Sequence, residues 1–435
     1  MIKTHKNKVL VVGGGGREHA LSWKLAQSNH VEIVFVAPGN AGTAMEDKLI
    51  NLDIKATEIQ RLADFTQKES IDLVVVGPED PLVAGIVDYL TTIGVKCFGP
   101  TSAAAQLEGS KIFAKEFMEK YKIPTATFTS FSNPNNAKAS LQNATYPIVI
   151  KADGLAAGKG VVIAENKNDA EKTVDELMTD QKFGTAGQSI VIEEFLEGEE
   201  VSFIAMVDGP NILPLATSQD HKAIRDGDIG LNTGGMGAYS PAPLVNEELN
   251  QKIMDQVILP TVAGMISEGV PYRGFLYAGL MISKHNEPKV LEYNCRFGDP
   301  ETQPIMMRLT SDLFEMIESC FDGTIASQSI EWDQRPALGV IMASSGYPET
   351  YATGFRIDGI DEMDSFNPDI KIFHSGTTID NNQVVTHGGR VLCVTALGKD
   401  IKDSKKQAYK AVKNITWGSE YYRKDIGDKA IKRLN

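Results

Sequence analysis

The chain has 435 residues, of which 42% are hydrophobic and 23% are charged, a composition that excludes a disordered or collagen-like protein. Its 43 basic and 57 acidic residues give a formal net charge of −14, which argues against general binding of nucleic acid or membrane surfaces but allows a local basic pocket. The length is typical of about three domains.

The cysteines and the apolar runs bear on the cellular compartment. Cys97, Cys295, Cys320 and Cys393 lie far apart without a CxxC pair or zinc-like spacing, so we expect reduced and mostly buried thiols. The first apolar run ends at Gly13 and is too short for a signal peptide. Apolar runs also fall short of the ~18 residues that cross a bilayer. The sequence predicts a soluble cytoplasmic protein.

The first hundred residues alternate short apolar strands with helical stretches. Strands are predicted at 8–12, 31–37, 71–77 and 95–100. Such alternation is typical of βαβ units and a parallel sheet, whose ligands bind beyond the carboxyl ends of the strands. Those ends carry glycines at 13–16, 39, 77 and 99, so we expect a glycine-lined crevice at one edge.

The rest of the chain has a different pattern. A helix is predicted over 108–124, and strands follow in 147–165, 189–209, 274–283 and 288–294. A long helix is expected after Asp299, with Pro300 in its first turn. The glycine-rich stretch between 218 and 241 is interpreted as a loop too long for a simple connection. The tail from about residue 331 is rich in strands and ends in a helix near 405–413.

Gly13–Gly16 and Arg17 follow a strand and open a helix, an arrangement that attracts anions. A dinucleotide fingerprint would need a third small residue where Glu18 or His19 stands. Phosphate or sugar binding is therefore favoured over a plain tight turn and over NAD binding. His19 is interpreted as a capping or packing residue.

Residues 151–160 (KADGLAAGKG) form the strongest single motif. Gly154, Gly158 and Gly160 allow a loop to lie against phosphates, and Lys151 and Lys159 supply positive charge. The spacing differs from a Walker A loop, and a strand follows where that loop has a helix. A glycine-rich hairpin that covers ATP is favoured over a purely structural hairpin.

Two acidic segments complete the pattern. In 290–294 (VLEYN), alternation places Glu292 and Asn294 on one strand face, where two oxygen ligands can share a hard cation; a half-exposed polar face is the alternative. In 193–200 (EEFLEGEE), backbone beside Phe195 and Leu196 can read an adenine edge, and an acid past the bend can accept ribose hydroxyls. A solvated acidic hairpin is the alternative for this second segment.

Together these motifs show that the chain resembles the glycinamide ribonucleotide synthetase family of ATP-grasp enzymes along essentially its whole length. The resemblance is carried by VVGGGGREHAL, VAPGNAGT, VGPEDPLVAG, LEGSKIFAK, IVIKADGLAAGKGV, IVIEEFLEGEE, TSQDHK, NTGGMGAYSP, GFLYAGLM, EYNCRFGDPETQP, GGRVLCVTALG and RKDIG. So many long matches in one order make it specific.

The resemblance implies an α/β and α+β multidomain fold. Residues 1–108 would form an N-terminal Rossmann-like domain, and 109–330 a two-part ATP-grasp module. This module would comprise a lid over about 124–195 and a core over about 196–330. Residues 331–435 would form a small β-rich C-terminal domain.

The resemblance also implies an activity. The family joins glycine to 5-phosphoribosylamine through a glycyl phosphate, with ATP as a substrate and Mg²⁺ or Mn²⁺ as cofactor, in purine biosynthesis. We expect these small molecules as the partners and a monomer as the assembly. The alternative is another ATP-grasp carboxylate–amine ligase of purine metabolism. A nicotinamide dehydrogenase is disfavoured by the broken fingerprint, and a non-catalytic nucleotide sensor by the metal pair.

Site residues follow by similarity, position by position. The ATP contacts would be Lys111, Lys151, Gly154, Gly158, Lys159, Gly160, Glu193, Glu194, Leu196 and Glu200. The metal ligands would be Glu292 and Asn294. Catalytic roles fall to Lys151, Asp220 and Arg296, the last two on the glycine side. Further candidates for the sugar phosphate or glycine are Gly15, Arg17, Glu79, Lys222, Gly389 and Arg390. Many other ATP-grasp enzymes carry a further metal acid on the preceding strand, where 277–281 (YAGLM) offers none.

Overall fold

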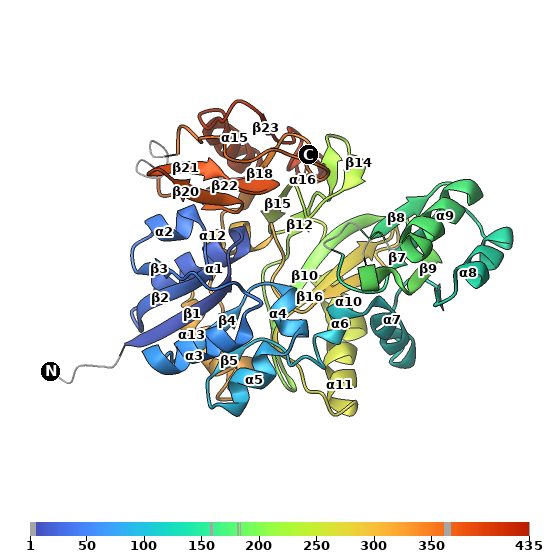
Figure 1. Cartoon of the computed structure of the whole chain (residues 1–435), viewed down its shortest axis with the longest axis horizontal. Helices are drawn as coiled ribbons and strands as arrows, with labels where there is room; N and C mark the ends of the chain where they lie inside the picture. The colour runs from blue at the N-terminus through green and yellow to red at the C-terminus, as the bar shows by residue number, and fades with distance from the viewer. Residues whose placement is uncertain (1–5, 157–159, 181, 183, 361–366, 435) are drawn as a thin grey trace.

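The computed structural model describes residues 6–156, 160–180, 182, 184–360 and 367–434. Figure 1 shows three regions around a centre: the N-terminal domain, the C-terminal domain above it, and the lid set apart on the right. Among the described residues, no helix is both long and apolar enough to cross a membrane. The side chains of all four cysteines are free and buried, as predicted.

The N-terminal domain is built on a five-stranded parallel sheet in the order β3-β2-β1-β4-β5. Its strands are β1 (Asn7–Gly13), β2 (Val31–Pro38), β3 (Leu49–Asn51), β4 (Leu73–Val76) and β5 (Cys97–Phe98). Its helices are α1 (Gly16–Ala26), α2 (Ala41–Met45), α3 (Ile59–Glu69), α4 (Glu79–Val83) and α5 (Ile86–Thr92). The apolar residues of β1 are fully buried because helices cover both faces of a parallel sheet. The predicted parallel α/β fold is confirmed, with the order reversing at β1.

The lid is a separate antiparallel sheet in the order β6-β9-β7-β8. It consists of β6 (Phe128–Phe131), α8 (Pro134–Ser140), η1 (Leu141–Asn143), β7 (Ile148–Ala152), β8 (Val161–Ala164), α9 (Lys167–Val174), η2 (Asp175–Thr179), η3 (Gly184–Gly187) and β9 (Ile190–Glu194). It has its own apolar core, in which Ile150, Val174 and Ile190 are fully buried. Helices α6 (Gln106–Gly109) and α7 (Lys111–Lys120) lead into it from the N-terminal domain.

The central sheet is antiparallel, in the order β11-β10-β16-β17. It comprises β10 (Glu199–Asp208), β11 (Asn211–Pro214), β16 (Arg273–Ile282) and β17 (Pro288–Asn294), with α10 (Glu247–Ile253), η4 (Met254–Ile258) and α11 (Leu259–Ser267) packed beside it. Gly279 faces Glu292 while Leu280 faces Val290, so Leu291 is a bulge residue with no opposite partner in the ladder. A bulge of this kind frees backbone groups for other contacts.

The prediction of a long helix after Asp299 is wrong. The structure has two short helices, α12 (Thr302–Arg308) and α13 (Leu313–Ser319). Leu309 is extended and forms a bridge with Trp332, which ends α12. Asp312 then caps α13 by accepting hydrogen bonds from the backbone N–H groups of Phe314 and Glu315.

The C-terminal sheet borrows strands from the middle of the chain, which corrects the loop interpretation of 218–241. Its order is β12-β15-β18-β22-β19, with β23 also paired to β18. These strands are β12 (Gln219–Asp220), β15 (Gly237–Ser240), β18 (Ala337–Ser344), β19 (Ile370–His374), β22 (Arg390–Leu397) and β23 (Glu420–Tyr421). Strand β15 pairs antiparallel with β18, a contact between segments about 100 residues apart that sequence periodicity does not reveal.

Two hairpins and the remaining helices complete this region. The hairpins are β13 (Ala223–Arg225) with β14 (Ile229–Asn232), and β20 (Thr377–Asp380) with β21 (Gln383–Thr386). The helices are α15 (Ile401–Val412) and α16 (Asp428–Leu434), whereas η5 (Ile325–Ser327) packs against β10 and β11 of the central sheet. The predicted helix near 405–413 corresponds to α15, and α16 was not predicted. Figure 1 shows β14 beside the C-terminal domain, on the side where the lid lies.

Candidate active site

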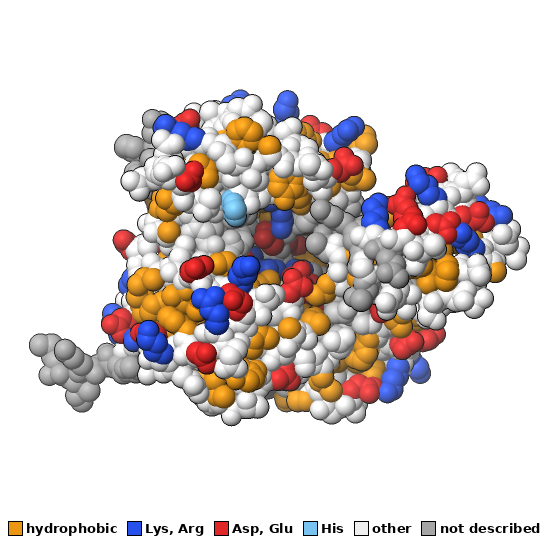
Figure 2. Space-filling view, viewed as in Figure 1, with side chains coloured by type: hydrophobic (Ala, Val, Ile, Leu, Met, Phe, Trp, Pro, Cys, Tyr) orange, Lys and Arg blue, Asp and Glu red, His pale blue; other side chains and the backbone are white. Residues whose placement is uncertain are grey.

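A cavity of about 510 Å³ lies where the N-terminal domain, the lid, the central sheet and the C-terminal domain meet. Figure 2 shows it as a hollow near the middle of the molecule, with basic and acidic side chains around it. Each region contributes side chains: Arg17 from α1, Lys151 from the lid, Glu292 from the central sheet and Arg390 from β22. No single domain therefore contains the whole site.

The cavity brings together most of the residues singled out from the sequence. Those that line it are Arg17, Glu79, Lys111, Lys151, Gly160, Glu193, Glu194, Leu196, Glu200, Asp220, Lys222, Glu292, Asn294, Arg296 and Arg390. Gly15, Gly154 and Gly389 do not line it. Gly158 and Lys159 lie outside the described residues.

Lys151 is fixed by contacts from two domains. Its ammonium donates to the backbone oxygen of Leu291 at 3.0 Å and pairs with Glu193. The Leu291 oxygen belongs to the bulge in β17, so an irregularity of the central sheet receives a lysine of the lid. Glu193 also pairs with Lys115, whose pKa burial lowers. One buried carboxylate thus serves two ammonium groups.

Lys111 lies at the start of α7, and hydrogen bonds connect this end of the helix to Asp153, the residue that follows β7. The Asp153 carboxylate accepts hydrogen bonds from the Ser110 hydroxyl at 2.9 Å and the Ile112 backbone N–H at 2.8 Å. The Lys111 ammonium donates to the backbone oxygen of Gly154 at 3.0 Å. Gly154 therefore holds a lysine that lines the cavity, although it does not line the cavity itself. Burial lowers the pKa of Lys111, and the nearby Glu292 charge opposes that shift.

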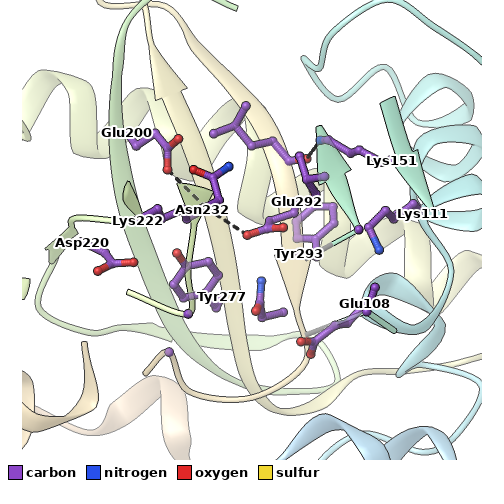
Figure 3. A pocket seen from close by; sticks show the side chains of 18 of the residues that line it. Glu108, Lys111, Lys151, Glu200, Asp220, Lys222, Asn232, Tyr277, Glu292 and Tyr293 are labelled. Atoms are coloured by element: carbon purple, nitrogen blue, oxygen red, sulfur yellow. Dashed lines mark hydrogen bonds and ion pairs between the residues drawn. The ribbon is translucent and has the colours of Figure 1, made fainter. Parts of the chain in front are cut away.

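Glu292 and Asn294 both line the cavity, but so do Leu291 and Tyr293, because the bulge disturbs the simple alternation expected for this strand. The Lys222 ammonium lies 3.0 Å from a Glu292 oxygen and 3.2 Å from a Glu200 oxygen (Figure 3). Lys222 holds the pKa of Glu292 at about 2, so this carboxylate is ionised. Burial would lower the pKa of Lys222, but the two carboxylates raise it well above its usual value.

An ionised carboxylate and an amide oxygen form a donor set that suits a hard divalent cation. Asn294 is only 8% exposed and lies in the same cavity. The residues present therefore fit Mg²⁺ or Mn²⁺.

One end of the cavity is apolar. Glu194 accepts a hydrogen bond from the backbone N–H of Thr127 at 3.1 Å and pairs with Lys289 at 2.9 Å, which fixes the start of the bend. Phe195 and Leu196 follow it into the cavity. Other apolar lining residues near the lid and central sheet are Val149, Val161, Ile163, Val191 and Met281. A flat apolar group fits this end.

The opposite end is rich in arginines that are paired by the chain itself. Arg296 donates to Glu79 at 3.1 Å and to Glu108 at 2.7 Å. Although burial opposes it, Arg296 and Arg17 lower the pKa of Glu79 to about 2. Arg390 donates to the backbone oxygens of Gly234 at 2.6 Å and Asp299 at 2.7 Å.

In the glycine loop at 13–16, a side chain of the chain itself takes the place that an anion could occupy. The backbone N–H of Gly15 donates to the Glu18 carboxylate at 2.6 Å, so α1 carries its own acid at its N-terminus. Glu18 further accepts from Arg17 at 2.5 Å. Gly389 is packed against Tyr347, because a Cβ at this position would lie 2.3 Å from its ring.

Sequence reasoning missed several lining residues, namely Glu108, Lys115, Tyr277, Asp299 and Glu301. Glu301 accepts a hydrogen bond from Ser202 at 2.7 Å, and burial together with Glu301 raises the pKa of Asp220 well above its usual value. Glu301 stands beside Pro300 in the sequence, where only the start of a helix was predicted. The other four lie in segments that carry the resemblance, at 107–115, 274–281 and 292–304, but those segments do not show which side chains face a cavity.

Family models of phosphoribosylglycinamide synthetase match its N domain at residues 7–108, its ATP-grasp (A) domain at 109–302 and its C domain at 337–429. The chain belongs to this family. The predicted resemblance and fold class are confirmed.

Individual relatives cover nearly the whole chain. A phosphoribosylamine–glycine ligase of Escherichia coli (strain K12) is 56% identical over 98% of this chain and 99% of its own length. The crystal structure of a phosphoribosylamine–glycine ligase from Thermotoga maritima has a TM-score of 0.83 and 33% identity, covering 96% of this chain and all of that one. The biotin carboxylase domain of Hydrogenobacter thermophilus 2-oxoglutarate carboxylase, in complex with MgADP and bicarbonate, has a TM-score of 0.73 at 14% identity over 96% of this chain and 92% of that one, which shows the fold alone.

The shared carboxylate of Glu193 makes a stability prediction. Replacing Glu193 by Gln leaves Lys115 and Lys151, which are 3% and 6% exposed, without their counter-charge. We expect a loss of about 3 kcal/mol in the free energy of unfolding, measured by urea titration with circular dichroism. Glu268→Gln, which removes the exposed pair with Lys120, is the matched control and should leave the unfolding midpoint unchanged. Equal behaviour of the two variants would contradict this role of Glu193.

Proposed function

We propose that this cavity is the active site in which the chain, a phosphoribosylamine–glycine ligase of purine biosynthesis, joins glycine to 5-phosphoribosylamine while ATP is cleaved to ADP and phosphate. The observation that carries the proposal is the meeting of Lys111 and Lys151 with Glu292 in one cavity between lid and central sheet. A carboxylate and a γ-phosphate repel each other, and fixed ammonium groups with a cation ligand are the means of overcoming that repulsion.

The cavity orients ATP by its two unlike ends. Its apolar end would take adenine, with Glu194 and Leu196 at the edge and Glu200 near the ribose. The ammonium groups of Lys111 and Lys151 would face the phosphates. Gly160, which lines the cavity, is a further proposed contact, and Glu193 acts by holding Lys151 in place.

Glu292 and Asn294 would hold Mg²⁺ or Mn²⁺. A bound divalent ion supplies positive charge that neutralises the ATP phosphates. Glu292 brings one negative charge and Asn294 none, so most of that positive charge is left for the nucleotide.

The chemistry then takes two displacements. A glycine carboxylate oxygen attacks the γ-phosphorus and the bond to ADP breaks, giving glycyl phosphate. The amine of phosphoribosylamine attacks the acyl carbon, the C–N bond forms and phosphate leaves. The amine nitrogen also gives up a proton, for which Asp220 is our proposed acceptor, because its carboxyl group lines the same cavity. Enclosure of the acyl phosphate by the lid would exclude water.

The arginine-rich end is proposed for the other substrates. Arg296 and Asp220 would contact glycine, and Arg17, Glu79, Lys222 and Arg390 the sugar phosphate. Gly15 and Gly389 would act only through backbone shape, because they lie behind the lining. The internal pairs of these arginines would hold them in place until an anionic substrate arrives.

Family membership supports domains at 1–108, 109–330 and 331–435, since the matched family ranges fall inside them. We also propose the lid at about 124–195 and the core at about 196–330, since the sheet β6-β9-β7-β8 lies within the first range and the sheet β11-β10-β16-β17 within the second. We further propose that the protein is cytoplasmic and monomeric. Light scattering would test the monomeric state.

The substrates are tested by leaving out one at a time. ADP release should require both glycine and phosphoribosylamine, and alanine should support much less of it. Turnover without the amine, or equal turnover with alanine, would remove the assignment and favour another carboxylate–amine ligase. In the same assay Asp220→Asn should lower kcat and raise the KM for glycine while leaving the KM for ATP unchanged.

The metal ligands are tested by a charge change of constant size. Glu292→Gln removes the ionised oxygen and should raise the Mg²⁺ concentration needed for half-maximal turnover at least tenfold, or abolish turnover, because one charge-assisted ligand is lost. Glu287→Gln, at an exposed position paired with Lys252, is the control. If both variants give the same Mg²⁺ titration, this strand end is a solvated face and the metal assignment is wrong.

A further inference from the structure

The segment Arg423–Gly427 (RKDIG) carries part of the family resemblance but does not line the cavity. The Arg423 side chain is completely buried. Its guanidinium donates to both oxygens of Asp425 at 2.7 and 2.6 Å, to Asp228 at 2.9 Å and to the backbone oxygen of Ala223 at 3.0 Å. Burying a guanidinium is costly unless it is fully paired, so the buried position of Arg423 depends on these acceptors.

Two of those acceptors belong to the β13–β14 hairpin. An isolated two-stranded hairpin is marginally stable, and Ile229 and Leu231 of this one are 62% and 53% exposed. The C-terminal segment supplies the missing support, since the Gly227 backbone N–H donates to Asp425 at 2.8 Å and the Tyr421 hydroxyl to the backbone oxygen of Ile224 at 2.8 Å. The hairpin is thus held from the side away from the cavity.

The base of the hairpin opens into the cavity. Lys222 directly precedes β13, and its backbone oxygen accepts hydrogen bonds at 2.8 Å from both the N–H and the hydroxyl of Thr233. Asn232, Thr233 and Gly234 line the cavity next to Lys222. The Ala223 oxygen bound by Arg423 is therefore one residue from the lysine that bridges Glu200 and Glu292 (Figure 3).

We propose that Arg423, with Asp425, is a positioning element that holds the β13–β14 hairpin and thereby sets the Lys222 ammonium between Glu200 and Glu292. A lysine side chain has many rotamers, so two ion pairs at 3.0 and 3.2 Å require a fixed backbone beneath it. Arg423 acts through Lys222 and touches no substrate. This inference rests on the proposed function, because it assigns Lys222 to the substrate site.

A double-mutant cycle tests the inference. Arg423→Gln, Lys222→Gln and the double variant are compared with the full wild-type chain, by kcat/KM for ADP release and by calorimetric affinity for ADP in the presence of Mg²⁺. Without a placed ammonium, Glu200 and Glu292 repel the nucleotide phosphates, so we expect each single variant to lose roughly tenfold in both readouts. The double variant should be no worse than Lys222→Gln, although Arg423→Gln still lowers the thermal unfolding midpoint in that background.

The control and the opposite result separate positioning from general stability. Arg356→Gln removes the exposed pair with Asp358 at 2.8 Å, elsewhere in the C-terminal domain, and should leave both readouts unchanged. Multiplied losses in the double variant would overturn the proposal. If Arg423→Gln does not fold, Tyr421→Phe replaces it, with a smaller loss that must likewise vanish in the Lys222→Gln background. Wild-type protein that binds ADP without glycine-dependent turnover would refute the proposed function, while the affinity cycle would still decide this inference.

Discussion

Lysine ammonium groups enclosed with carboxylates are the interaction on which the site depends. Lys115 and Lys151 share Glu193, and Lys222 is shared by Glu200 and Glu292. Because Glu193 and its two lysines are buried, an unpaired charge among them would be costly. The result is a site whose cations are already in place before an anionic substrate arrives, so little reorganisation is needed during the reaction.

The fold builds this arrangement from parts that could not make it alone. The lid supplies Lys151, but the backbone oxygen that fixes it comes from the bulge in the central sheet. The N-terminal domain supplies Glu79, whose partner Arg296 follows the last strand of that sheet. The C-terminal domain supplies Arg390 and holds the hairpin that follows Lys222. Each domain contributes to the catalytic cavity and to the support of its neighbours.

Much of the fold could be predicted because its signals are local. The alternation of apolar strands and helices predicted the parallel sheet, and the strand ending at Asn294 was visible in residues 290–294. The strands between 219 and 240 could not be predicted, since they are two to four residues long and exist only by pairing with one another or with distant strands. A helix after Asp299 was predicted, but the early end of α12 was not, because it depends on the bridge from Leu309 to Trp332.

For the candidate site, residue types were easier to predict than pairings. Glycine-rich loops and strand-end acids were evident, but nothing in the sequence shows that Arg296 is held by Glu79 and Glu108 or that Lys115 meets Glu193. Such pairs join segments up to 217 residues apart, and only the folded chain brings them together. The same holds for Arg423, whose partners in the hairpin lie 195 and 200 residues away.

Transfer of the γ-phosphoryl group to the glycine carboxylate is the step on which the proposed function depends. Glycine labelled with ¹⁸O in both carboxylate oxygens tests this most directly, with mass spectrometry of the phosphate released during turnover with ATP and phosphoribosylamine. Attack by the carboxylate and later departure of the acyl phosphate predict one ¹⁸O atom in each phosphate, with the second retained in the amide product. Phosphate free of ¹⁸O would contradict this transfer.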